Sequence, residues 1–99
     1  MQREYNFYVY MMASDSGTLY TGVTNSPWRR SHEHKRGEGG AFTKRYRCHK
    51  LVYYEHFEDI NEAIKREKQI KRWNRKKKES LIRKFNPLWV DLTEQVVEV

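Results

Sequence analysis

Apolar and aromatic residues recur in two spacings along this chain, and each spacing predicts a kind of element. Residues 7–12 form a nearly continuous apolar run, which predicts a strand buried on both faces. Residues 19–24 resume extended character after a turn rich in Ser, Asp and Gly, so the two segments are expected to pair as an antiparallel hairpin. Tyr10 and Tyr20 should share one face of that hairpin, although the register stays open. Residues 51–57 have the composition of a third strand.

Three helices are expected where an N-cap residue precedes a run with helical spacing. The caps are Ser26, Asp59 and Asn74, whose short polar side chains can accept from a free backbone N–H. Residues 37–40, rich in glycine, should then be a mobile loop. The expected helices cover residues 27–36, 60–73 and 75–85. The order β-β-α-β-α-α predicts an α/β (α+β) sandwich, a three-stranded, mainly antiparallel sheet flanked by helices.

The chain has 99 residues and a formal net charge of +7, and the charge is unevenly distributed. Residues 62–84 carry eleven Lys/Arg against three Asp/Glu, whereas residues 85–99 carry three acids and no base. A basic block in a helical stretch is typical of a protein that binds a polyanion, although it is also compatible with a solvated helix face. The length predicts one domain, 1–99, with its core at about 5–85 and a C-terminal extension at 86–99.

Cysteine count and hydropathy exclude two protein classes. Cys48 is the only cysteine, so no disulfide can form within the chain. The longest apolar run is far too short to cross a bilayer, and the first residues lack the apolar core of a signal peptide. We therefore expect a cytoplasmic protein without a membrane partner.

Five side chains are candidates for chemistry on phosphate. Arg30 and His34 are four residues apart and lie on one face of the first expected helix. Glu67 falls on or beside the apolar stripe of the second, where a carboxylate is costly unless it is paired or holds a metal. Tyr10 and Tyr20 supply phenols. Each also has an ordinary reading: the tyrosines as half-buried sheet residues, the arginine and histidine as surface residues, and Glu67 as an ion-pair partner of Lys71 or Arg30.

The ordered set of these residues resembles the GIY-YIG nuclease family, and in particular its small stand-alone bacterial members. The first motif reads Tyr8-Val9-Tyr10 and the second Tyr20-Thr21-Gly22. Arg30 and His34 match residues of the family's first helix, and Glu67 matches the acid of a later helix. Tyr8 replaces the first Gly of the consensus, Thr21 replaces an Ile, and Val23 stands where some relatives carry a Lys. Asn74 and Asn86 are both candidates for a late Asn found in many members.

The resemblance implies a metal-dependent endonuclease that hydrolyses DNA phosphodiester bonds. Arg30 would hold phosphate, and Glu67 would bind Mg²⁺ or Mn²⁺. Tyr20 is by resemblance the base and Tyr10 its partner, though the sequence does not separate them. His34 would hold a phosphate, donate a proton to the leaving oxygen or assist Tyr20. Residues expected to bind nucleic acid are Lys44, Arg45, Lys68, Lys71, Arg72, Arg75, Lys76 and Lys77.

Other functions are compatible with the same sequence. A structure-selective role in repair or recombination, with a protein partner supplying specificity, fits a small domain. The main alternative is a nucleic-acid-binding module that keeps the fold without cleaving, and RNA is a further possible ligand. A zinc site can be drawn from His32, His34, Cys48 and His49, but no CxxC pair supports it. Trp28, Trp73 and Trp89 are expected to be core or helix-packing residues rather than platforms for base stacking.

Overall fold

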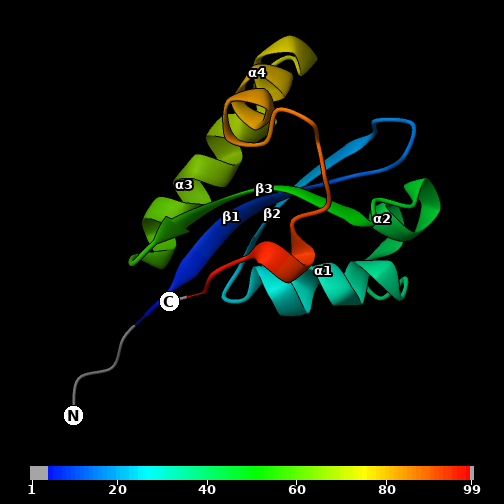
Figure 1. Cartoon of the computed structure of the whole chain (residues 1–99). Helices are drawn as coiled ribbons and strands as arrows, with labels where there is room; N and C mark the ends of the chain where they lie inside the picture. Colours follow the sequence, from blue (N-terminus) through cyan, green and yellow to red (C-terminus); the bar gives the residue numbers. More distant parts are fainter. Residues whose placement is uncertain (1–4, 99) are drawn as a thin grey trace.

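A computed structural model describes residues 5–98, and a three-stranded antiparallel sheet forms its centre (Figure 1). The strands are β1 (Phe7–Ala13), β2 (Leu19–Thr24) and β3 (Lys50–Phe57), in the order β2-β1-β3. Tyr10 lies opposite Gly22, and Met12 lies opposite Tyr20. Tyr10 and Tyr20 are therefore diagonal neighbours on one face, as expected, with ring centroids 6.1 Å apart.

In the described part of the chain, four α-helices pack around the sheet: α1 (Pro27–Lys35), α2 (Ala41–Tyr46), α3 (Ile60–Lys71) and α4 (Arg75–Phe85). The predicted caps are confirmed, because Ser26, Asp59 and Asn74 each accept a hydrogen bond from a backbone N–H in the first turn. The predicted fold class and element order are confirmed as well. Helix α2 is an addition to that order, a six-residue helix whose N-cap is Gly40, so it has no side-chain cap.

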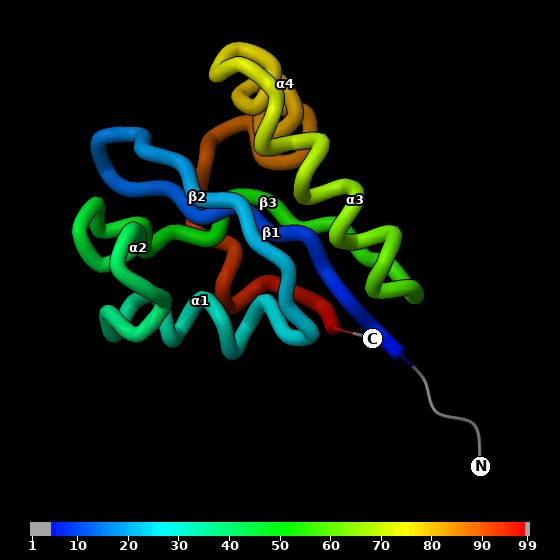
Figure 2. Tube along the Cα trace, turned by 180° about the vertical axis from the view of Figure 1, so that it is seen from behind, coloured from blue at the N-terminus to red at the C-terminus, as the bar shows by residue number. Residues whose placement is uncertain are grey.

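The helices lie in layers on the two faces of the sheet (Figures 1 and 2). Val9 and Met11 of the central strand pack with Ile70 and Ile82, on the face covered by α3 and α4. Tyr10, between them in sequence, points to the opposite face, where α1 lies. Because side chains alternate along a strand, one strand supplies both cores. The prediction that β1 is buried on both faces is confirmed.

The segment after α4 runs back along the sheet and ends near α1. Asn86 is buried, and its amide donates to the carbonyls of Val52 and Val90. Leu92 and Val96 then pack against the core cluster that contains Tyr10. A short 3₁₀ helix, η1 (Thr93–Gln95), contacts α1. Asn86 thus has a structural role.

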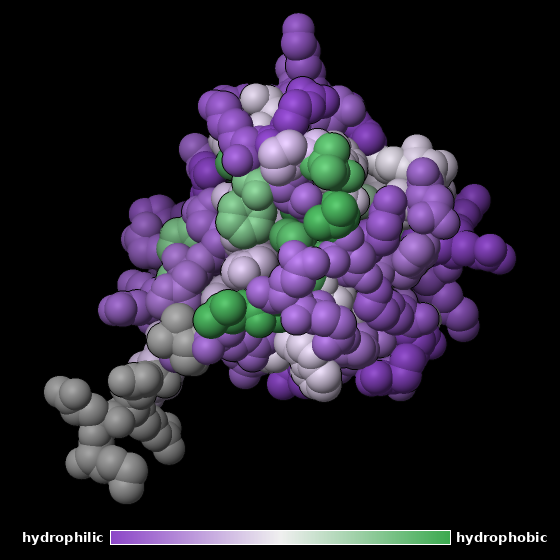
Figure 3. Space-filling view, viewed as in Figure 1, coloured by the Kyte–Doolittle hydropathy of each residue, from purple (hydrophilic) through white to green (hydrophobic). Residues whose placement is uncertain are grey.

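The surface is mainly hydrophilic on the face seen in Figure 1, with hydrophobic atoms gathered near its middle (Figure 3). Phe85 and Leu88, which are exposed, lie at the end of α4 and just beyond it. Within residues 5–98, none of the helices is long and apolar enough to cross a membrane.

Candidate active site

The centre of the site is the buried phenol of Tyr10. Its hydroxyl lies 3.0 Å from Nε2 of His34 and accepts a hydrogen bond from Nε of Arg30 at 3.3 Å. The guanidinium can only donate, so the phenol's own proton is available for His34. Burial raises the pKa of Tyr10 well above the ordinary value, and the Arg30 hydrogen bond offsets only part of that shift. Tyr10 is therefore a protonated phenol at neutral pH.

His34 is the acceptor that this arrangement requires. Burial, with the nearby charge of Arg30, lowers the pKa of His34 to about 4. The imidazole is therefore neutral at pH 7, and accepting at Nε2 assigns its proton to Nδ1. Nδ1 is buried, and it has no hydrogen-bond partner within residues 5–98. His34 at neutral pH is an acceptor for Tyr10, not a cation.

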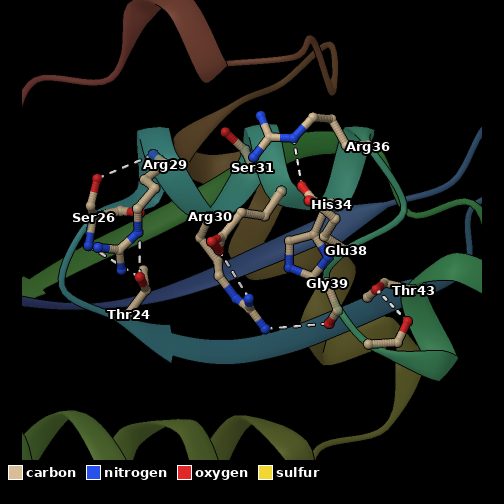
Figure 4. A network of polar contacts seen from close by, with 12 residues as sticks. Thr24, Ser26, Arg29, Arg30, Ser31, His34, Arg36, Glu38, Gly39 and Thr43 are labelled. Carbon is tan, nitrogen blue, oxygen red and sulfur yellow. Dashed lines mark hydrogen bonds and ion pairs between the residues drawn. The ribbon is translucent and has the colours of Figure 1, made fainter.

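Arg30 is held in one orientation by three groups, of which Figure 4 labels Gly39. Besides Tyr10, its guanidinium donates to Oε1 of Glu33 at 3.0 Å and to the carbonyl oxygen of Gly39 at 3.3 Å. Burial opposes the charge, but the hydrogen bonds to Tyr10 and Glu33 outweigh it and raise the pKa of Arg30. The result is a fixed positive charge beside Tyr10.

Two glycines allow these side chains to approach the backbone closely, and sequence reasoning missed their role. A Cβ at Gly39 would lie 2.1 Å from Nδ1 of His34, and one at Gly22 would lie 2.8 Å from the hydroxyl of Tyr10. The place of Gly22 in the second motif could have indicated its role from the sequence. Nothing in the sequence distinguishes Gly39 from the neighbouring glycines. Residues 37–40, predicted to be a mobile loop, thus include a buried glycine that contacts both His34 and Arg30.

Tyr20 is the ring of the site that reaches solvent. It is half-buried, and its centroid lies 5.4 Å from that of His34. It also lines a surface depression together with Phe42 of α2, Lys71 of α3 and Lys78 of α4. The depression therefore crosses the edge strand β2 and joins elements from both faces of the sheet. Tyr10 lies behind this opening and Tyr20 lies in it.

Glu67 is on the other face of the sheet from Arg30. Its carboxylate pairs with Nζ of Lys71 at 3.3 Å, and its side chain is 20% exposed. Of the two ion pairs that the sequence allowed, the structure has the one with Lys71, while Arg30 pairs with Glu33. Lys71 also lines the depression beside Tyr20, which places Glu67 one helical turn from that opening. Four of the five predicted site residues thus form one cluster, whereas Glu67 lies outside it and is connected to the depression only through its partner Lys71.

The eight residues predicted to bind nucleic acid are all exposed, and they fall in three groups. Lys44 and Arg45 are on α2, and Lys71 borders the depression with Tyr20. The others surround Trp73 or extend α4: Lys68, Arg72, Arg75, Lys76 and Lys77. Lys78, expected to point to water, is half-buried and borders the depression instead. The reason is that α4 starts beside the hairpin turn, as the Arg75 guanidinium next to Gly17 shows.

The four residues of the zinc alternative have different partners. His34 contacts Tyr10, His32 contacts Glu94, His49 pairs with Asp15, and the Cys48 thiol points to the carbonyl of Thr18. Among residues 5–98, no group of three or more His, Cys, Asp or Glu is arranged to hold a metal ion. Asn74 is accounted for as the cap of α4.

Comparison with known proteins agrees with this geometry. The model of the GIY-YIG catalytic domain matches residues 6–80. A UPF0213 protein of Staphylococcus aureus strain Mu3 is 42% identical over 76 residues, which are 77% of this chain and 93% of that protein. UPF0213 protein SAV0488 of strain Mu50 matches to the same extent. The solution NMR structure of UPF0213 protein BH0048 from Bacillus halodurans is 30% identical, with a TM-score of 0.57 over 95% of this chain and 99% of that chain. The chain therefore belongs to the GIY-YIG nuclease family.

Proposed function

We propose that this protein is a metal-dependent endonuclease that hydrolyses DNA phosphodiester bonds. The observation that carries the proposal is the fixed Arg30 guanidinium on the hydroxyl of Tyr10, whose ring packs against Tyr20 in a depression lined also by two lysines. Phosphoryl transfer needs positive charge on the phosphoryl oxygens and an oriented water, and it needs little covalent chemistry from the protein. This arrangement supplies both requirements.

The positions of the two tyrosines favour different roles. Tyr20 borders the depression, so it can contact and orient the attacking water. Tyr10 is buried with a raised pKa, and its hydroxyl fixes Arg30. We assign Tyr20 to the water and Tyr10 to positioning. This division agrees with the expectation that Tyr20 is the base.

His34 has one role that its surroundings favour among the three expected. A neutral imidazole cannot hold phosphate by charge, and with a pKa of about 4 it is a poor reservoir of protons at pH 7. Its hydrogen bond with Tyr10 instead orients that phenol toward Arg30. We therefore propose that His34 assists the tyrosines and does not donate to the leaving oxygen.

Glu67 fits one divalent cation of the Mg²⁺ type. It offers a single hard oxygen donor group, partly open to solvent, with the exposed ammonium of Lys71 as its partner. Mg²⁺ usually keeps several waters and is held by one or two carboxylates plus phosphate oxygens, so one glutamate suffices. A Mg²⁺ or Mn²⁺ ion bound there supplies positive charge for the phosphoryl oxygens. Arg30 supplies charge from the other side of the edge strand.

DNA is the proposed polyanion because the basic side chains form a surface suited to phosphates. Lys68 and Lys71 are on α3, Arg72 is the residue at its C-cap, and the next basic residues follow on α4. Such contacts recognise the backbone rather than the base sequence. Selectivity would then come from DNA structure or from a protein partner, as a role in repair or recombination requires.

A cleavage assay with paired variants tests the proposal. Purified protein is incubated with Mg²⁺ or Mn²⁺ and labelled plasmid, forked and four-way DNA. Glu67→Ala and Arg30→Ala should abolish cutting while DNA binding survives. Glu62→Ala and Arg29→Ala are matched controls on the same helices, exposed and outside the cluster, and should cut like the parent. If all four variants cut alike, the nuclease proposal is wrong.

A binding module without cleavage is the second candidate, and one observation favours it. The Glu67 carboxylate is paired with Lys71. It extends from α3, which covers the face of the sheet opposite α1, the helix that carries Arg30 (Figure 1). If that ion pair persists with DNA bound, the metal has no ligand. The parent protein would then bind DNA with or without Mg²⁺ and cut none of the three substrates.

A further inference from the structure

Helix α2 presents two exposed aromatic rings that have no role in the proposed hydrolysis. Phe42 is 45% exposed and Tyr46 is 43% exposed. They are four residues apart, so they lie on one face of the helix, and their centroids are 4.8 Å apart. The Phe42 centroid is also 6.1 Å from that of Tyr20. Three rings therefore follow one another from the catalytic depression to the outer surface of α2.

Cationic side chains accompany this row of rings. The Arg45 guanidinium carbon lies 5.5 Å from the centroid of Tyr46, and Lys44 is its neighbour on α2. At the other end, Lys71 and Lys78 line the depression together with Tyr20 and Phe42. The six residues that line it include two lysines and no carboxylate.

Rings and cations in one row fit nucleic acid better than protein. An apolar protein segment would cover the rings but leave the ammonium and guanidinium groups facing it without partners. An acidic peptide would satisfy the charges but has no flat face for the rings. A nucleotide has both a base that stacks on an aromatic ring and a phosphate for the neighbouring cation. A base inside a double helix is already stacked on both sides, so the ligand must be an unstacked base.

We propose that Phe42 and Tyr46 form a stacking platform for unstacked nucleobases next to the scissile phosphate. This inference rests on the proposed function for its DNA ligand, and it adds a substrate class: DNA with unpaired bases beside the cut. The base can come from a single strand or from a mismatch or bulge within a duplex. Tyr20, at the inner end of the row, would contact the phosphate that joins the stacked nucleotides to the rest of the strand.

Binding measured without a metal ion tests the platform separately from catalysis. A single-stranded oligonucleotide carrying 2-aminopurine is titrated with protein in EDTA, and base stacking is followed as loss of its fluorescence. Phe42→Leu and Tyr46→Leu keep apolar side chains on α2 but remove the rings. Each should weaken binding roughly 5- to 150-fold, the range that loss of one base–aromatic stack gives. Thermal unfolding by circular dichroism checks that both variants are folded.

The controls separate stacking from charge and from general loss of affinity. Trp28, 48% exposed on α1, stacks on His32 rather than on this row, so Trp28→Leu should bind like the parent. An abasic oligonucleotide of the same length should bind the parent and the α2 variants equally. A duplex with one bulged 2-aminopurine distinguishes an extruded base from a single strand.

Two results would overturn the platform. One is parental affinity and quenching in both α2 variants. The other is the same loss of affinity for the abasic strand, which would show that the rings do not act through bases. Because no cleavage is measured, an inactive protein would disprove the nuclease proposal and leave this test valid.

Discussion

The buried hydroxyl of Tyr10 contacts both Arg30 and His34, and so connects the residues of the site. It accepts from Arg30 and faces Nε2 of His34, so the positions of both depend on it. Arg30 is further fixed by Glu33, whose pKa is lowered by their hydrogen bond. A guanidinium that is already in position before the reaction stabilises developing negative charge without a free-energy cost of reorientation. The positioning of Arg30 is the main chemical feature of the site at this scale.

The neutral state of His34 predicts an acid-sensitive fold. Its pKa is about 4 when folded and about 6.5 when unfolded, so between these values only the unfolded chain binds the proton. The free energy of unfolding should therefore fall from pH 6.5 to pH 4, by up to about 3 kcal/mol, and this contribution should be constant above pH 6.5. Urea denaturation of the parent and of His34→Gln across pH 4–8 measures it. Equal pH dependence in both proteins would contradict the assignment.

Gly39 predicts a sharp effect from one methyl group. In Gly39→Ala the new Cβ would overlap the imidazole of His34, so the ring must move away from Tyr10. Overpacking of this kind costs about 1–3 kcal/mol. We also expect the pKa of His34 to rise toward its ordinary value, which NMR titration of the ring protons detects.

Gly40→Ala is the matched control for that variant. A Cβ there would meet nothing within 4 Å, although the residue has φ +114° and the change strains the backbone. It should therefore destabilise the loop and leave the pKa of His34 near 4. If both variants shift the histidine equally, close approach at Gly39 is not what positions the ring.

The individual residues could be predicted to different extents. Tyr10, Tyr20, Arg30 and His34 could be placed together because a hairpin leading into a helix brings them near each other by short-range geometry. The ion pair of Glu33 with Arg30 could not be predicted, because it depends on which way the Arg30 side chain turns. The same holds for Gly39, whose contact with His34 depends on the path of a glycine-rich loop.

At the scale of elements, helix starts were the most predictable feature. Ser26, Asp59 and Asn74 each accept from a backbone N–H of their own helix, which is a local interaction that sequence can predict. At α1 a tertiary contact adds to the cap, because Glu98 accepts from Oγ of Ser26 and from the N–H of Trp28. Helix α2 has no such cap, contains six residues and follows a glycine with positive φ. A helix this short is stabilised by packing rather than by local sequence, so no local signal predicted it.

The junction of α3 and α4 predicts how binding depends on salt. Lys71 and Lys78 border the depression from different helices, so each is expected to contact a phosphate. Lys71→Ala and Lys78→Ala should weaken DNA binding and reduce the slope of log K against log salt by about 1 each. Anisotropy titrations over a salt series measure the slope. Lys84→Ala, in the last turn of α4, should leave it unchanged, and an equal change there would indicate diffuse attraction instead.

At the scale of the whole molecule, the layers decide which site residues can act together. Tyr10, Arg30 and His34 lie on the α1 face of the sheet, and Glu67 extends from α3 on the other (Figures 1 and 2). A shared substrate must therefore bind across the edge strand β2, where the depression next to Tyr20 lies. The sequence predicted the carboxylate but not its face, because no local pattern determines how α3 packs relative to α1.

The central claim is that the two faces form one site around β2, and Mn²⁺ tests it most directly. In ¹⁵N-labelled protein bound to a phosphorothioate oligonucleotide that resists cleavage, Mn²⁺ broadens signals near its binding site. We expect broadening at Glu67 together with Tyr20 and Arg30, and its loss in Glu67→Gln. Broadening confined to the acidic residues after Asn86, or to α3 without Tyr20 and Arg30, would contradict a single site.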